Sequence, residues 1–212
     1  PAMLEKSVAS LTANLEAAGQ IGAAGVIFHG GSHKGKGFDA ILDQAATALR
    51  EVLSKCPPDV WLVIENSAGM GSHIGSSFAE IGRLIRELDS PSVKVCLDTQ
   101  HTYAAGYDIT NPDGITKAME EFDAEIGLSR LVAVHANDSK MELGSGVDRH
   151  ENIGDGHIGE SGFETIMAHP AFRDVPFLLE VPGSDPDSKG PDKPNVDALK
   201  TIRDRLGIPA WV

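Results

Sequence analysis

Five short apolar runs alternate with amphipathic stretches, and this alternation constrains the fold more than any other feature of the sequence. The runs are GVIFH (25–29), WLVIE (61–65), VKVCLD (93–98), LVAVH (131–135) and PFLLE (176–180). Continuous rather than alternating apolarity is typical of strands that are buried on both faces of a parallel sheet. Helices between such strands serve as right-handed crossovers. The sequence therefore predicts an α/β fold built on one parallel sheet.

Helical periodicity fills the intervals between these runs. Apolar residues recur at spacings of three and four in the segments 3–18, 38–53, 78–88, 115–126, 163–168 and 196–206, as expected for helices that bury one face. No linker or low-complexity tract divides the 212 residues, and this length suffices for one domain with a substantial core. We therefore expect a single domain over residues 1–212.

Every one of the five runs ends in a residue type that binds metal ions. These residues are His29, Glu65, Asp98, His135 and Glu180. One such residue at a strand end is more often a capped or solvated side chain, but five out of five is hard to reach in that way. The carboxyl ends of parallel strands meet in one mouth, where unpaired buried carboxylates would repel one another and take up protons. Bound cations at this mouth are the natural resolution.

Further ligand types lie close to these ends. His101 follows Asp98 by three residues, and a long glycine-rich loop after residue 135 carries Asp148, His150 and His157. Ordering such a loop costs about 1–2 kcal/mol per residue in backbone entropy, which metal binding would offset. The alternative is a solvated loop whose charges face water. We expect Asn66, Asn137 and His157 to orient ligands or the loop rather than to bind metal.

Charge and composition exclude several classes of protein. The net charge of −13 argues against binding nucleic acid by bulk electrostatics, although bound cations would dominate the field at a metal site. No apolar run reaches the length of a membrane span, and the segment 1–10 does not have the pattern of a signal peptide. Cys56 and Cys96 form no disulfide framework. The expectations are a cytoplasmic location and no membrane partner.

Five segments carry a resemblance to a known family. They are FHGGSHKG (28–35), IENSAGMG (64–71), LDTQHTYAAGYDI (97–109), HANDSKMELGSGVDRHENIGDGHIG (135–159) and LLEVPG (178–183). Here the chain resembles the endonuclease IV family, the zinc-dependent apurinic/apyrimidinic endonucleases also called AP endonuclease family 2. VDRHENIGDGHIG (147–159) is long enough to be a specific signal by itself.

The resemblance implies a xylose-isomerase-like TIM (β/α)8 barrel, of which this chain holds about five βα units, strands four to eight. The N-terminal strands would be missing, together with a further zinc-binding histidine that the family places on a strand before His29. We expect a fragment of a longer protein rather than a naturally short form, because the exposed edges of a parallel sheet invite aggregation.

The resemblance also implies a site with three zinc ions (Zn2+), although these ligand types tolerate Mn2+ at some positions. Glu65 would be the catalytic residue that bridges two zinc ions and positions them with a hydroxide. The implied ligands are His29 for the first ion, Asp98, His135 and Glu180 for the second, and His101, Asp148 and His150 for the third. The implied reaction is DNA repair by hydrolysis of the phosphodiester 5′ to an abasic site in duplex DNA, which leaves a 3′-hydroxyl, by a protein that is monomeric when complete.

Two other functions fit the same architecture. A metal-dependent sugar isomerase or epimerase also uses histidines and carboxylates at the strand ends of a barrel, and fold alone does not separate the two enzymes. That function leaves Asp148 and His150 without a role. A non-catalytic, decayed barrel is the third hypothesis.

Overall fold

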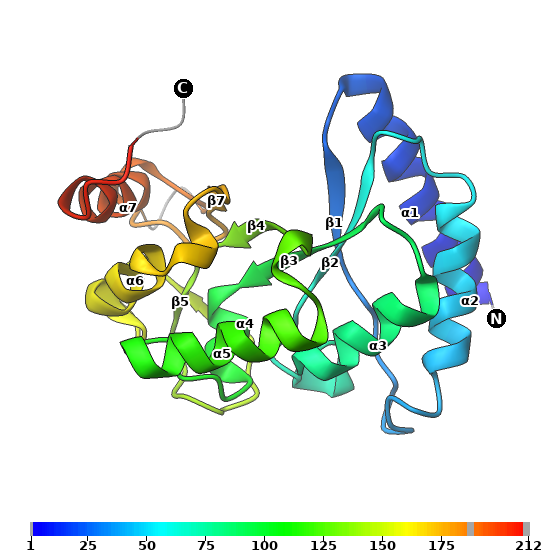
Figure 1. Cartoon of the computed structure of the whole chain (residues 1–212), viewed down its shortest axis with the longest axis horizontal. Coiled ribbons are helices and arrows are strands. Elements are labelled where there is room, and N and C mark those ends of the chain that lie inside the picture. The colour runs from blue at the N-terminus through cyan, green and yellow to red at the C-terminus, as the bar shows by residue number, and fades with distance from the viewer. Residues whose placement is uncertain (1, 186–188, 210–212) are drawn as a thin grey trace.

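The computed structural model describes residues 2–185 and 189–209, which contain one five-stranded parallel sheet (Figure 1). Its strands are β1 (Gly25–His29), β2 (Trp61–Glu65), β3 (Val93–Asp98), β4 (Leu131–His135) and β7 (Phe177–Leu178), in the order β1-β2-β3-β4-β7. Every neighbouring pair is parallel. The predicted α/β sheet is thereby confirmed, and its first four strands have the predicted bounds.

The last strand is shorter than the predicted run 176–180. The N–H of Val134 donates to Pro176 O (2.9 Å), and the N–H of Ala136 donates to Leu178 O (2.7 Å). Beyond this point the N–H of Glu180 donates to the side-chain oxygen of Asn137 (2.9 Å). A side chain replaces the ladder there, so the strand ends early while Glu180 remains at the mouth.

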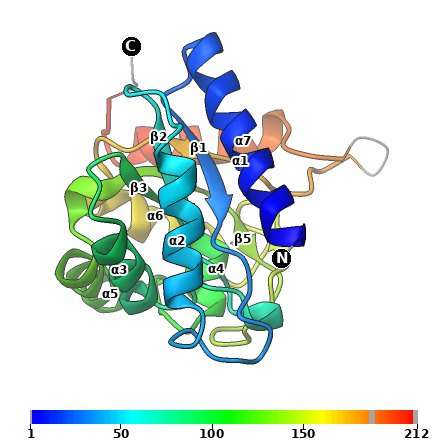
Figure 2. The same cartoon turned by 90° about the vertical axis from the view of Figure 1, so that its right-hand side faces the viewer.

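Helices cover the outer face of the sheet (Figures 1 and 2). They are α1 (Ala2–Ile21), α2 (Leu42–Leu53), α3 (Phe78–Leu88), α5 (Pro112–Glu125), α6 (Gly159–Ala168) and α7 (Lys193–Arg205). The short helix α4 (Thr99–Ala104) follows β3 directly at the mouth. Three single 3-10 turns, Met70–Ser72, Leu128–Arg130 and Pro170–Phe172, complete the helical elements of the described residues.

Several helix starts follow from local capping. The starts of α5 and α7 lie three residues before the predicted ones, and those of α2 and α6 differ from prediction by four residues. Ser77 and Asn111 cap α3 and α5 by accepting the N–H groups of residues 80 (3.3 Å) and 114 (2.9 Å), which stabilises a helix by about 1 kcal/mol each. Helix α2 begins at Leu42 rather than at residue 38 because Ile41 has a non-helical backbone, with φ −120° and ψ −3°. Helix α6 begins at Gly159, before the predicted residue 163.

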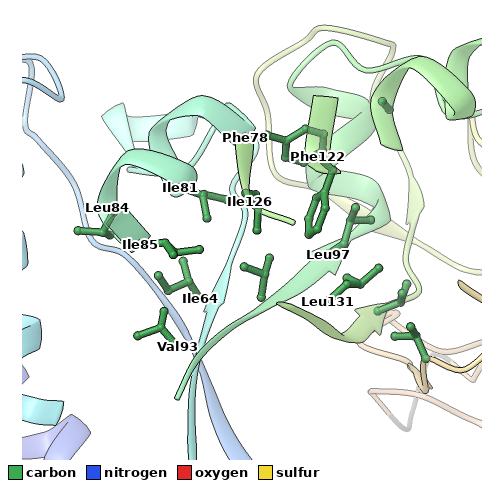
Figure 3. Close-up of a cluster of buried hydrophobic side chains, with 14 of the residues drawn as sticks. Ile64, Phe78, Ile81, Leu84, Ile85, Val93, Leu97, Phe122, Ile126 and Leu131 are labelled. Carbon is green, nitrogen blue, oxygen red and sulfur yellow. The ribbon is translucent and has the colours of Figure 1, made fainter. Parts of the chain in front are cut away.

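The main core lies between the sheet and these helices (Figure 3). Ile64 and Leu97 from the strands pack among Phe78, Ile81 and Phe122 from α3 and α5. The rings of Phe78 and Phe122 meet edge to face with centroids 5.3 Å apart, a favourable aromatic geometry. Each such buried side chain contributes about 1.5–3 kcal/mol, and this packing holds the strand ends in place.

The inner face of the sheet carries a smaller apolar cluster made of Val63, Cys96 and Ala133. Strands β1 and β7 are edge strands, since each pairs with a single neighbour within the described part of the chain. On the edge strand β7, Leu178 is 45% exposed. The sheet is therefore open, as the expectation of about five βα units required. Over residues 2–185 and 189–209, no helix combines the length and apolarity needed to cross a membrane.

Candidate metal centre

The strand-end residues converge because the sheet is in register at its carboxyl edge. His29 lies beside Glu65 in the β1–β2 ladder, and Asp98 lies beside His135 in the β3–β4 ladder. Their side chains share one face because they occupy equivalent positions of neighbouring strands. Glu180, just after β7, completes the row at the far side.

The carboxylate of Glu65 lies at the centre of the cluster. Its Oε2 is 3.6 Å from His29 Nε2, while its Oε1 is 3.3 Å from His101 Nδ1 and 3.1 Å from His135 Nδ1. His135 Nδ1 is also 3.1 Å from Glu180 Oε2. Both oxygens of Glu65 therefore face ligand-type atoms, which is the arrangement expected of a bridging carboxylate.

Two groups of side chains place their ligand atoms within 4.8 Å of one another. One group consists of Glu65, Asp98, His135 and Glu180, and the other consists of Asp98, His101 and His150. Asp98 belongs to both groups and is completely buried. Two groups of candidate ligands that share one carboxylate therefore lie side by side at this mouth.

Asp148 joins the second group from the long loop. Its Oδ2 is 3.4 Å from His101 Nε2, and its Oδ1 is 3.4 Å from His150 Nε2. The loop is brought back by a short antiparallel pairing between β5 (Asp138–Ser139) and β6 (His150–Glu151). These two-residue strands are too short to produce a periodic pattern, so the sequence did not predict them.

Three buried atoms of the site form no hydrogen bond within the described part of the chain: Glu65 Oε1, His135 Nδ1 and His150 Nε2. Buried polar atoms are nearly always satisfied, and an unsatisfied one costs about 1–3 kcal/mol. Mixed histidine and carboxylate donors are the set that Zn2+ accepts. The side chains at the mouth therefore fit divalent cations, which would satisfy all three atoms.

Oppositely charged side chains face one another across the site and shift one another's pKa values. Burial raises the pKa of Glu65, but the neighbouring His101, His135 and His29 outweigh this effect and lower the pKa to about 2. Burial lowers the pKa of His101, but Asp98, Asp148 and Glu65 outweigh it and raise the pKa to about 11. His135 follows the same pattern: despite burial, Cys96, Glu180 and Glu65 raise its pKa to about 12.

Asn66 and Asn137 hydrogen-bond to the candidate ligand residues Asp98 and Glu180, as expected from the sequence. Asn137 donates from Nδ2 to Asp98 Oδ2 (2.6 Å), and its Oδ1 accepts the N–H of Glu180 (2.9 Å). Asn66 accepts the N–H of Asp98 (2.7 Å) and donates to Thr102 Oγ1 (3.0 Å). The side chain of His157 is exposed, and its contact with this region is a backbone N–H that donates to Ser139 O (2.7 Å).

Comparison with known proteins supports the resemblance found in the sequence. A family model described as a xylose isomerase-like TIM barrel matches residues 1–205. A protein of Natronomonas pharaonis named probable endonuclease 4 is 42% identical over 178 residues, which cover 84% of this chain and 63% of that protein. The chain belongs to the endonuclease IV family.

Other members of the endonuclease IV family are also similar to this chain. A probable endonuclease 4 of Streptomyces avermitilis is 40% identical over 207 residues, which cover 96% of this chain and 66% of that protein. The crystal structure of endonuclease IV from Thermus thermophilus superposes with a TM-score of 0.77 at 33% identity, covering 96% of this chain and 69% of the other. The chain thus spans 63% of the length of the Natronomonas relative. A D-tagatose 3-epimerase-like protein superposes with a TM-score of 0.70 at 17% identity, which shows a shared fold alone.

Proposed function

We propose that this protein is a zinc-dependent DNA repair endonuclease that hydrolyses the phosphodiester 5′ to abasic sites in duplex DNA and leaves a 3′-hydroxyl. One observation carries the proposal: a chain of the endonuclease IV family has, at one mouth, two groups of metal-ligand side chains that share Asp98. A sugar isomerase on the same fold would not require the second group.

Three zinc ions are proposed, each with its own side chains. Glu65 would bridge two ions and His29 would bind the first. Asp98, His135 and Glu180 would bind the second, and His101, Asp148 and His150 the third. Bound zinc would supply Lewis-acid activation of water and stabilise charge on the phosphate and the leaving oxygen.

The protein side chains have positioning tasks in this reaction. Glu65 stays ionised at every physiological pH because its pKa lies near 2, so its two oxygens remain available as acceptors on both sides. Asn137 restrains the buried carboxylate of Asp98 by donating to its Oδ2, and Asn66 accepts the backbone N–H of Asp98. Arg149 and Lys140 have exposed side chains beside the mouth and are suited to contact DNA phosphates, which would fix the duplex without reading its sequence.

The test is a nicking assay on a labelled duplex that contains one abasic site, with an undamaged duplex as the substrate control. The zinc-loaded protein is expected to cut on the 5′ side of the abasic site, and a DNA polymerase should extend the resulting 3′-hydroxyl. Glu65→Gln should abolish cutting, whereas Glu142→Gln, the same change at an exposed position of the loop that carries Asp148, should leave it unchanged. Wild-type rates from Glu65→Gln would refute the mechanism. Conversion of a ketose without nicking would favour the isomerase.

A further inference from the structure

We propose that Asp138 positions the second half of the loop between β4 and α6 (residues 136–158), and with it His150, against the rest of the candidate metal centre. The proposal rests on the proposed metal-dependent function only in assuming that the site binds zinc. Asp138 is completely buried, and it is neither one of the proposed ligands nor one of the residues that sequence reasoning selected.

The carboxylate of Asp138 accepts hydrogen bonds from five backbone N–H groups. Oδ1 accepts from Ser139 (2.7 Å) and Ile158 (2.9 Å), Oδ2 accepts from Gly154 (2.9 Å) and Gly156 (3.1 Å), and Gly159 donates to both oxygens (3.3 and 3.1 Å). Four of these five donors belong to residues 154–159. Charge-assisted hydrogen bonds of this kind are roughly twice as strong as neutral ones. A single buried side chain therefore gathers the whole segment around itself.

The glycines of this segment allow the close approach. Gly154 and Gly159 have positive φ angles of 93° and 68°, which other residues adopt only with strain. At Gly156 a Cβ would lie 2.5 Å from Asp138 Oδ1 and 2.5 Å from Ser139 O. The pattern GDGHIG thus forms a ring of backbone N–H groups around an anion, and this anion belongs to the protein itself.

Asp138 also caps helix α6 from a distance. The helix begins at Gly159, and its N-cap residue Ile158 makes no side-chain capping hydrogen bond. The first N–H groups of a helix need acceptors and favour negative charge. Asp138 provides both through the N–H groups of Ile158 and Gly159. The end of the loop and the start of the helix are therefore fixed by the same carboxylate.

The segment that carries Asp138 is itself anchored to the end of strand β3. Its neighbour Asn137 holds the carboxylate of Asp98 (2.6 Å). Across the β5–β6 pairing, Ser139 lies opposite His150, whose Nε2 is 3.8 Å from Asp98 Oδ2. The other end of the loop is held separately, because Gln100 Nε2 donates to Val147 O (3.0 Å). Loss of the Asp138 contacts should therefore release His150 more than Asp148.

The test compares Asp138→Asn with Asp155→Asn, the same change at an exposed position of the same loop. In either orientation the new amide group would face at least two backbone N–H donors. Zinc affinity is measured by titration against a chromophoric chelator, independently of any nuclease activity. Asp138→Asn is expected to weaken one zinc position by about 10–100-fold, the usual effect of removing a residue that orients ligands, while the other positions and Asp155→Asn keep wild-type affinity.

Two results would overturn the proposal: wild-type affinity at every position in folded Asp138→Asn, or an equal loss at all positions, which would indicate a general loss of stability. Gly156→Ala approaches the same contact from the loop side. It should weaken the same position, and the double variant should lose less than the sum of the two single effects.

A measurement on the unmodified protein covers the case in which these variants fail to fold. Amide hydrogen exchange, followed by NMR on the metal-free protein, should show the N–H groups of Gly154, Gly156, Ile158 and Gly159 protected together. Exchange at the rate of free amides would refute the role of Asp138. Nicking can fail without changing either readout, so a failure of the proposed function and a failure of this inference are distinguishable.

Discussion

Asn137 links Asp98 to Glu180 through its side chain. Its replacement by alanine tests whether protein contacts orient these two candidate ligands. Its side chain, completely buried, donates to Asp98 Oδ2 (2.6 Å) and accepts the N–H of Glu180 (2.9 Å). Asn137→Ala removes both contacts and leaves the backbone N–H of residue 137 bonded to Thr99 Oγ1 (2.9 Å). The change therefore isolates the contribution of the side chain.

The expected cost follows from the groups that are left unpaired. Asp98 is completely buried, and burial raises the pKa of its carboxyl; leaving this buried acceptor without its donor costs about 1–3 kcal/mol. The hydrogen bond from the N–H of Glu180 is only partly buried, so its loss costs less, about 1 kcal/mol. Together these predict a destabilisation of about 3 kcal/mol, a large share of the 5–15 kcal/mol that is typical of a folded domain.

Urea unfolding followed by circular dichroism, with a chelator present to exclude metal, measures this value. Asn14→Ala is the matched control, since Asn14 is exposed on α1 and its Nδ2 donates to Ser10 O of the preceding turn (3.0 Å). It should change stability by less than about 0.5 kcal/mol. A loss below about 1 kcal/mol for Asn137→Ala would refute the reasoning. It would mean that water replaces the asparagine in holding Asp98.

Three further predictions concern the core and the metal. Phe122→Ala should destabilise the protein by about 3–5 kcal/mol, because the ring is completely buried; a urea midpoint equal to that of the wild type would contradict this. Zinc binding should release protons, because His101 and His135 hold theirs with pKa values of about 11 and 12 in the metal-free site, and zinc affinity should fall as the pH falls. Calorimetric enthalpies that do not vary between buffers of different ionisation enthalpy would refute that release. His150→Ala should lose one zinc ion per chain by metal analysis, whereas His169→Ala, at the far end of α6, should retain the full complement; retention of every ion by both variants would remove His150 from the site.

Much of the architecture can be predicted from local sequence patterns. The run WLVIE became β2 (Trp61–Glu65) without a shift at either end, because a strand buried on both faces needs apolar residues throughout and so leaves a continuous signal. The residues expected at the strand ends were brought to one mouth for the same reason: parallel strands in register must present their last residues together. The family resemblance, carried mainly by residues 135–159, added the expected grouping of the ligands.

Contacts between distant residues decided the rest. Strand β7 ends at Leu178 because Asn137 takes the N–H of Glu180 out of the ladder. Helix α6 starts at Gly159 because Asp138, twenty-one positions earlier, accepts the N–H groups that local residues leave unpaired. Neither event has a local signature, since the residue that supplies the acceptor is remote from the residue whose conformation it decides. Strand positions and ligand types can be predicted from neighbours along the chain, whereas the ends of elements and the placement of the loop depend on hydrogen bonds that exist only after the chain has folded.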